Sequence, residues 1–62
     1  MNYKVINNFK ETYVIYVQLE DNQVYALALD IMLKYKYKIV NNILYKKHKK
    51  LGRIVRFLEN EN

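Results

Sequence analysis

The chain has 62 residues and a net charge of +5, and 52% of its residues are hydrophobic, but it contains no cysteine and a single histidine. This length predicts one domain, residues 1–62, with a small core, because a chain of this size buries only about 60% of its unfolded surface. Disulfides, thiolate metal sites and a zinc site built by the chain alone are excluded, and no apolar run is long enough to cross a membrane. We therefore expect an intracellular, cytoplasmic protein.

The N-terminal part of the chain predicts a hairpin. Residues 1–10 fit either a loose helical turn or an edge segment packed under a sheet. In residues 11–19, Tyr13, Ile15, Val17 and Leu19 form an apolar set at every second position, which indicates a strand. The alternation resumes at Tyr25. Pairing Leu19 with Tyr25, and Val17 with Leu27, keeps both apolar sets on one face and leaves Asp-Asn-Gln at 21–23 as a three-residue loop.

A long alternating stretch follows. Every second residue is apolar or aromatic: Tyr25, Leu27, Leu29, Ile31, Leu33, Tyr35, Tyr37 and Ile39. A period of two predicts extended chain, but a strand of this length does not fit so small a domain. We expect it to bend or break near residues 30–33 and to form two strands.

The C-terminal third allows two structures. Asn41-Asn42 fits a two-residue hairpin turn with positive φ at both positions, which places Ile39 opposite Leu44 and runs Lys36 and Lys38 beside Lys47 and Tyr45. Alternatively, Asn42 caps a helix. The only glycine, Gly52, indicates the boundary of an element, residues 53–58 predict a final strand, and residues 59–62 a frayed tail. Residues 43–50 fit a strand and a short helix about equally well.

Basic residues dominate the second half of the chain. No acidic residue lies between Ile31 and Leu58, whereas nine of the eleven lysines and arginines do. Alternate lysines on a strand lie about 6.5–7 Å apart, near the phosphate spacing of an extended single strand, and tyrosines can stack on bases. Candidate nucleic-acid-binding residues are Lys34, Tyr35, Lys36, Tyr37, Lys38, Lys46, Lys47, Lys49, Lys50, Arg53 and Arg56. A solvated basic face, with Tyr35 and Tyr37 in the core, is the structural alternative.

Catalytic patterns are lacking in the sequence. The six acids are scattered, no serine is available for a triad, and His48 stands among four lysines, as a surface histidine would. We therefore expect no enzyme activity, no cofactor and no metal.

The order of predicted elements, with VQLEDN at 17–22 and LGRIV at 51–55, resembles the Sm-like family (Lsm and bacterial Hfq proteins). The resemblance implies a small, strongly bent barrel that assembles into rings and binds single-stranded, often U-rich, RNA. Tyr35 falls where the family places a stacking side chain, and Tyr37 takes the place of its asparagine. The family's glycine in the second strand is absent, because Ala26 or Leu27 stands there, and its Arg-Gly near the last strand is replaced by Arg-Phe-Leu at 56–58.

These patterns together predict a mainly β domain, a strongly bent antiparallel sheet forming a partly open Sm- or SH3-like barrel. The alternative is an α+β fold, a three-stranded sheet covered by a C-terminal helix. We expect the protein to bind RNA or single-stranded DNA through the basic surface of residues 34–56, as a homo-oligomer. The rival function is a protein-binding inhibitor or adaptor of viral or mobile-element type, whose exposed tyrosines contact a partner protein.

Overall fold

The computed structural model describes residues 3–7 and 14–60. Within these residues the chain is mainly β, with one short helix. The elements are β1 (Tyr3–Ile6), β2 (Ile15–Leu19), β3 (Val24–Leu27), α1 (Leu29–Tyr35), β4 (Tyr37–Val40), β5 (Ile43–Lys46) and β6 (Lys49–Asn60). The predicted mainly β class is confirmed, and the alternative with a C-terminal helix is wrong.

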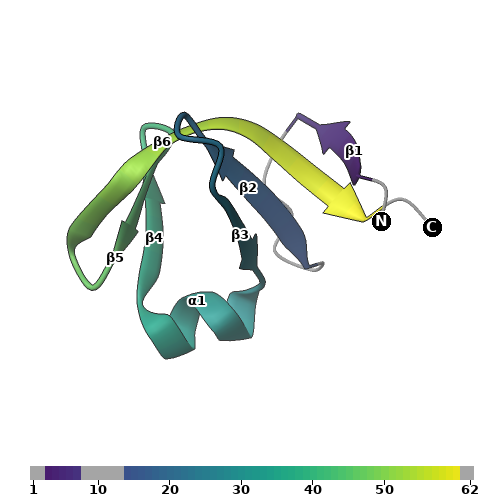
Figure 1. The fold of residues 1–62 in the computed structure, drawn as a ribbon. Helices are drawn as coiled ribbons and strands as arrows, with labels where there is room; N and C mark the ends of the chain where they lie inside the picture. The colour runs from purple at the N-terminus through teal and green to yellow at the C-terminus, as the bar shows by residue number, and fades with distance from the viewer. Residues whose placement is uncertain (1–2, 8–13, 61–62) are drawn as a thin grey trace.

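The long strand β6 organises the antiparallel sheet. The strand order is β3-β2-β6-β5-β4, and β1 also pairs with β6. The C-terminal half of β6 pairs with β1 and β2, and its N-terminal half pairs with β5. Figure 1 shows β6 arching over the molecule from the β5 hairpin to β1, while α1 runs below from β3 to β4. The two end strands of the order are joined by this helix and not by hydrogen bonds, so the bent sheet stays open.

The first hairpin forms in a register two residues away from the predicted one. Val17 lies opposite Tyr25 and Ile15 opposite Leu27, and the amide of Leu19 donates to the carbonyl of Gln23 at 2.9 Å. The loop is therefore 20–22, and its third residue, Asn22, has φ 70°. A three-residue hairpin loop needs a left-handed residue at its third position, and Asn tolerates that conformation better than Gln. A shift of two preserves the apolar face.

The predicted pair of strands over residues 25–39 is wrong in its middle, because residues 29–35 form α1. Ala28, Ile31 and Met32 are half-buried and lie on one helical face, and Met32 packs against the core. The helix ends at Lys36, whose φ of 58° is left-handed and whose amide donates to the carbonyl of Met32. The expected break near residues 30–33 is therefore present as a helix instead of a kink.

The Asn-Asn hairpin is confirmed, and the helix capped by Asn42 is wrong. Asn41 and Asn42 have φ of 51° and 61°, and Ile39 lies opposite Leu44. Lys38 lies opposite Tyr45, and the amide of Lys47 donates to the carbonyl of Lys36 at 3.0 Å, as the hairpin predicts.

The last strand is longer than predicted, because it begins at Lys49 and includes Glu59 and Asn60. Gly52 is therefore not a boundary but an interior residue beside a register shift in the β5–β6 pairing. It faces Leu44, and a Cβ atom added to it would lie 3.2 Å from Cδ1 of Leu19. The close packing of the Gly52 backbone against Leu19 therefore favours glycine at this position.

At the N-terminus, Tyr3–Ile6 is an edge strand of the sheet and not a helical turn. Strand β2 begins only at Ile15, and residues 11–13 of the predicted first strand lie outside the described residues, as do residues 61–62 of the predicted tail.

The core lies between the two halves of the bent sheet. Its buried side chains come from four strands: Val17, Leu19, Leu27, Leu44 and Ile54. Half-buried Tyr25, Met32, Tyr37, Ile39, Leu51 and Phe57 surround them. None of the described helical residues forms a segment long and apolar enough to cross a membrane.

Candidate functional site

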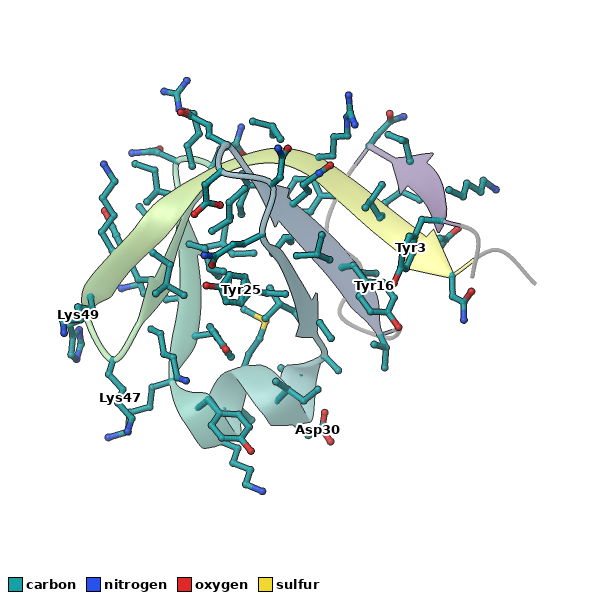
Figure 2. All side chains as sticks on the ribbon, in the orientation of Figure 1. Tyr3, Tyr16, Tyr25, Asp30, Lys47 and Lys49 are labelled. Carbon is teal, nitrogen blue, oxygen red and sulfur yellow. The ribbon has the colours of Figure 1, made fainter. Side chains whose placement is uncertain are left out.

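Lysines from α1, the α1–β4 junction and the β5–β6 turn gather at one end of the molecule. We call Lys34, Lys36, Lys46, Lys47 and Lys49 the basic end. The Nζ atoms of Lys34 and Lys46 each lie 5.4 Å from the centre of the Tyr35 ring. Lys47 is hydrogen-bonded to Lys36 through the main chain, and Lys46 lies opposite Lys49. Figure 2 shows Lys47 and Lys49 projecting from the tip of the β5–β6 hairpin.

Three tyrosines form a row beneath these lysines. The ring of Tyr37 lies 6.3 Å from both Tyr35 and Tyr25, in edge-to-face geometry each time. The ammonium of Lys46 also lies 5.6 Å from the centre of the Tyr37 ring, so the half-buried Lys46 makes cation–π contacts with two tyrosines. A cation over an aromatic face stabilises the pair by about 0.5–1 kcal/mol at an exposed site. Lys46 therefore supports the structure, besides adding charge.

The predicted strand-face geometry of residues 34–38 is wrong. Lys34 and Tyr35 belong to α1, Lys36 is left-handed, and only Tyr37 and Lys38 belong to β4. The lysines gather through a helix end and a hairpin instead of through alternation along one strand. Tyr37 packs against the core, whereas the Tyr35 side chain remains 42% exposed.

A groove opens between the β4–β5 hairpin and the C-terminal turn of α1, and the core-packed Met32 and Tyr37 also line it. Its volume is about 530 Å³, and its lining includes Leu33, Lys36, Lys38, Val40, Tyr45 and His48. Lys38 and Tyr45 are cross-strand partners, so their side chains share one face. Leu33 is 72% exposed, although it is a large apolar side chain. The groove thus joins an apolar and aromatic floor to a basic rim.

The remaining candidate residues are not at the basic end. Lys50 lies opposite Tyr45 on β6, whereas Arg53 and Arg56 stand further along that strand. The Nε atom of Arg53 lies 3.5 Å from a carboxylate oxygen of Glu20, and Arg56 donates to Gln18 at 3.5 Å. The predicted basic surface of residues 34–56 is therefore divided between the basic end and the first two thirds of β6.

Sequence analysis missed two apolar members of this site, Leu33 and Val40, because period-two alternation assigns Leu33 to an inward face. Both are exposed in the structure. Asp30 and Lys34, four residues apart, could have indicated the helix, because such opposite charges face each other on helices and not on strands. His48 is exposed in the β5–β6 turn, and no cluster of three potential metal ligands occurs among the described residues.

Comparison of the chain with models of protein families, with curated proteins and with solved structures finds no match. The resemblance to the Sm-like family stays a prediction.

Proposed function

We propose that this protein is a non-enzymatic nucleic-acid-binding protein that contacts the phosphates of RNA or single-stranded DNA through the basic end. The observation that carries the proposal is the convergence of five lysines from separate elements, none of which forms an ion pair with a described residue. Among the described residues, the ion pairs involve Lys4 with Glu59 and Arg53 with Glu20, and neither pair includes a lysine of the basic end. Uncompensated positive charge on a small surface attracts polyanions.

The rival function, protein binding through exposed tyrosines, has less support. Of the described tyrosines, Tyr3 and Tyr35 are exposed, at 43% and 42%, and the others are at least half-buried. Tyr3 packs against Tyr16 with a ring separation of 4.9 Å, on the side of β2 away from the basic end. Most of the tyrosine content is therefore used within the fold.

The test is the salt dependence of oligonucleotide binding. Each engaged lysine releases condensed counterion, so log Kd against log salt should have a slope of about 0.7 per phosphate contact on a single strand. The double variant Lys47→Ala/Lys49→Ala should make this slope shallower by about 1.4 and weaken binding to all sequences alike. Fluorescence anisotropy with labelled ribo- and deoxyoligonucleotides measures it.

The matched control is Arg53→Ala/Arg56→Ala, which removes the same charge from the middle of β6, outside the basic end. It should leave the slope nearly unchanged. An equal effect of the two double variants would show that net charge, and not the basic end, governs binding. Absence of binding at low salt would overturn the proposed function and leave a protein partner as the explanation of the surface.

A further inference from the structure

We propose that the groove beside α1 receives one unpaired base of the bound strand, so that the ligand is single-stranded at this point and is held by stacking as well as by charge. The inference rests on the proposed function, because the basic end is what brings a polyanion to the groove. It adds a second kind of contact, with Tyr45 as the stacking side chain and Leu33 and Val40 as the apolar walls.

The size and lining of the groove favour a flat aromatic ligand. Its volume of about 530 Å³ lies within the range of small-ligand sites, roughly 300–1,000 Å³. The exposed fractions of Leu33 and Val40, 72% and 39%, mean that apolar surface faces water there. A base that stacks on Tyr45 would cover this surface, since bases have apolar faces and polar edges.

The lysines around the groove indicate that the ligand carries negative charge beside its aromatic part. Lys36 and Lys38 are exposed and stand at the groove, and Lys47 adjoins Lys36 through their main-chain hydrogen bond. A base in the groove therefore has its own phosphates within the field of these ammonium groups. Charge complementarity of this kind fits a nucleotide chain and does not fit a neutral apolar ligand.

The edge of the sheet supplies polar groups for the edge of the base. Strand β4 ends the strand order. Lys36, just before β4, accepts a hydrogen bond from the amide of Lys47, and the same spacing of two makes Lys38 and Val40 the residues of β4 that are hydrogen-bonded to β5. In an antiparallel pair the intervening residues, here Tyr37 and Ile39, point their main-chain N–H and C=O groups away from the partner strand. Tyr37 is among the residues that line the groove, so its free N–H and C=O supply a donor and an acceptor there, which suits a base whose pairing edge is free.

The test compares three fluorescein-labelled ligands of equal length by anisotropy at one salt concentration. These are a single strand, the same backbone with abasic sites throughout, and a duplex. The single strand should bind about tenfold more tightly than the abasic strand, near the low end of what stacking one base contributes. The variant Tyr45→Leu should remove most of this preference while leaving the affinity for the abasic strand unchanged.

A second pair of variants keeps the test valid if Tyr45→Leu does not fold. Leu33→Gln removes an exposed apolar wall of the groove, and Leu29→Gln makes the same change about one turn earlier on α1, where Leu29 is 49% exposed and outside the groove lining. Glutamine is a good helix former, so both should fold. We expect Leu33→Gln to lower the preference for the base-bearing strand several-fold and Leu29→Gln to leave it unchanged.

Three results would overturn the inference. Equal affinity for base-bearing and abasic strands would show that phosphates alone are bound. The proposed function of the basic end would then hold, but the groove would have no part in binding. Equal affinity for single strand and duplex would exclude an unpaired base in the groove. Binding of no ligand at low salt would remove the proposed function together with this inference.

Discussion

At the scale of single residues, Leu27 is a core side chain whose truncation should cost a large part of the domain's stability. It is fully buried, and its cross-strand partner is Ile15, which is also fully buried. We expect Leu27→Ala to lower the free energy of unfolding by about 2–5 kcal/mol, a large share of the stability of a domain this small. Urea denaturation measures the loss, and Val24→Ala, in the same strand but 44% exposed, is the control. Equal midpoints for the two variants would contradict the assigned core.

Lys36 is a residue whose conformation and charge can be tested separately. It ends α1 with a φ of 58°, which costs a non-glycine residue about 1–2 kcal/mol. Lys36→Gly should relieve part of this cost and raise the melting temperature by about 4–8 °C per kcal/mol gained. If the ammonium contacts a phosphate, the same variant should make the salt slope of binding shallower by about 0.7.

The control for Lys36→Gly is Asn22→Gly, which relieves another left-handed residue, φ 70°, in the loop between β2 and β3. It should stabilise the protein without changing the salt slope. If the Lys36→Gly variant is more stable but its salt slope of binding is unchanged, the Lys36 ammonium does not contact a phosphate.

At the scale of elements, residues 29–35 show why alternation alone misled the sequence interpretation. Nearly every residue from Tyr25 to Leu33 is apolar, so a period of two and a period of 3.6 both find apolar residues at their positions. Ala28, Ile31 and Met32 form the half-buried helical face, and Met32 reaches the core. The choice between the two periods depended on which side chains the rest of the sheet could cover.

The β4–β5 turn gives the sharpest prediction for an element. Asn42 has φ 61°, and its carbonyl accepts a hydrogen bond from the amide of Ile54 at 2.7 Å, which ties the turn to β6. We expect Asn42→Val to destabilise the protein by about 1–2 kcal/mol, since a β-branched residue disfavours positive φ. Asn42→Gly should be neutral or stabilising.

Thermal unfolding of the two Asn42 variants checks this prediction. Strand propensity alone predicts the opposite order, because valine favours strands and glycine weakens them. A valine variant more stable than the glycine variant would therefore contradict the turn.

At the scale of the whole molecule, the two halves of the curved strand β6 pair with different strands and carry different surfaces. Its N-terminal half carries the hairpin of the basic end, and its C-terminal half pairs with β1 and β2. Cross-strand pairing there aligns Val5, Leu58, Tyr16 and Ala26 on one face, on which Leu58 is buried and Tyr16 is half-buried. Val5 is 63% exposed on this face.

This apolar face is consistent with the self-association that we propose from the composition. We expect light scattering at low micromolar concentration to give a mass above the 7.6 kDa of one chain. Val5→Lys should lower the measured mass, whereas Leu29→Lys, an equally large change on α1, should not. A wild-type mass of 7.6 kDa across this concentration range would rule out the oligomer.

Several features of the candidate site could be predicted from the sequence. The acid-free basic span, the Asn-Asn turn and the pairing of Lys36 and Lys38 with Lys47 and Tyr45 follow from residue types and short spacings, which local turn chemistry governs. The groove could not be predicted, because it forms between a helix and a hairpin whose relative placement depends on the core.

The sequence by itself determined the mainly β class, the presence of the first hairpin and the register of the Asn-Asn hairpin, because alternation and left-handed asparagines act over a few residues. Tertiary structure alone decided how the helix of residues 29–35 packs on the core through Met32, that Gly52 lies inside a strand against Leu19, and that Arg53 and Arg56 are separated from the basic end. The physical reason is common to all three. Each depends on how β6 bends across the core, and that bend follows from which apolar side chains the opposite half of the sheet can bury.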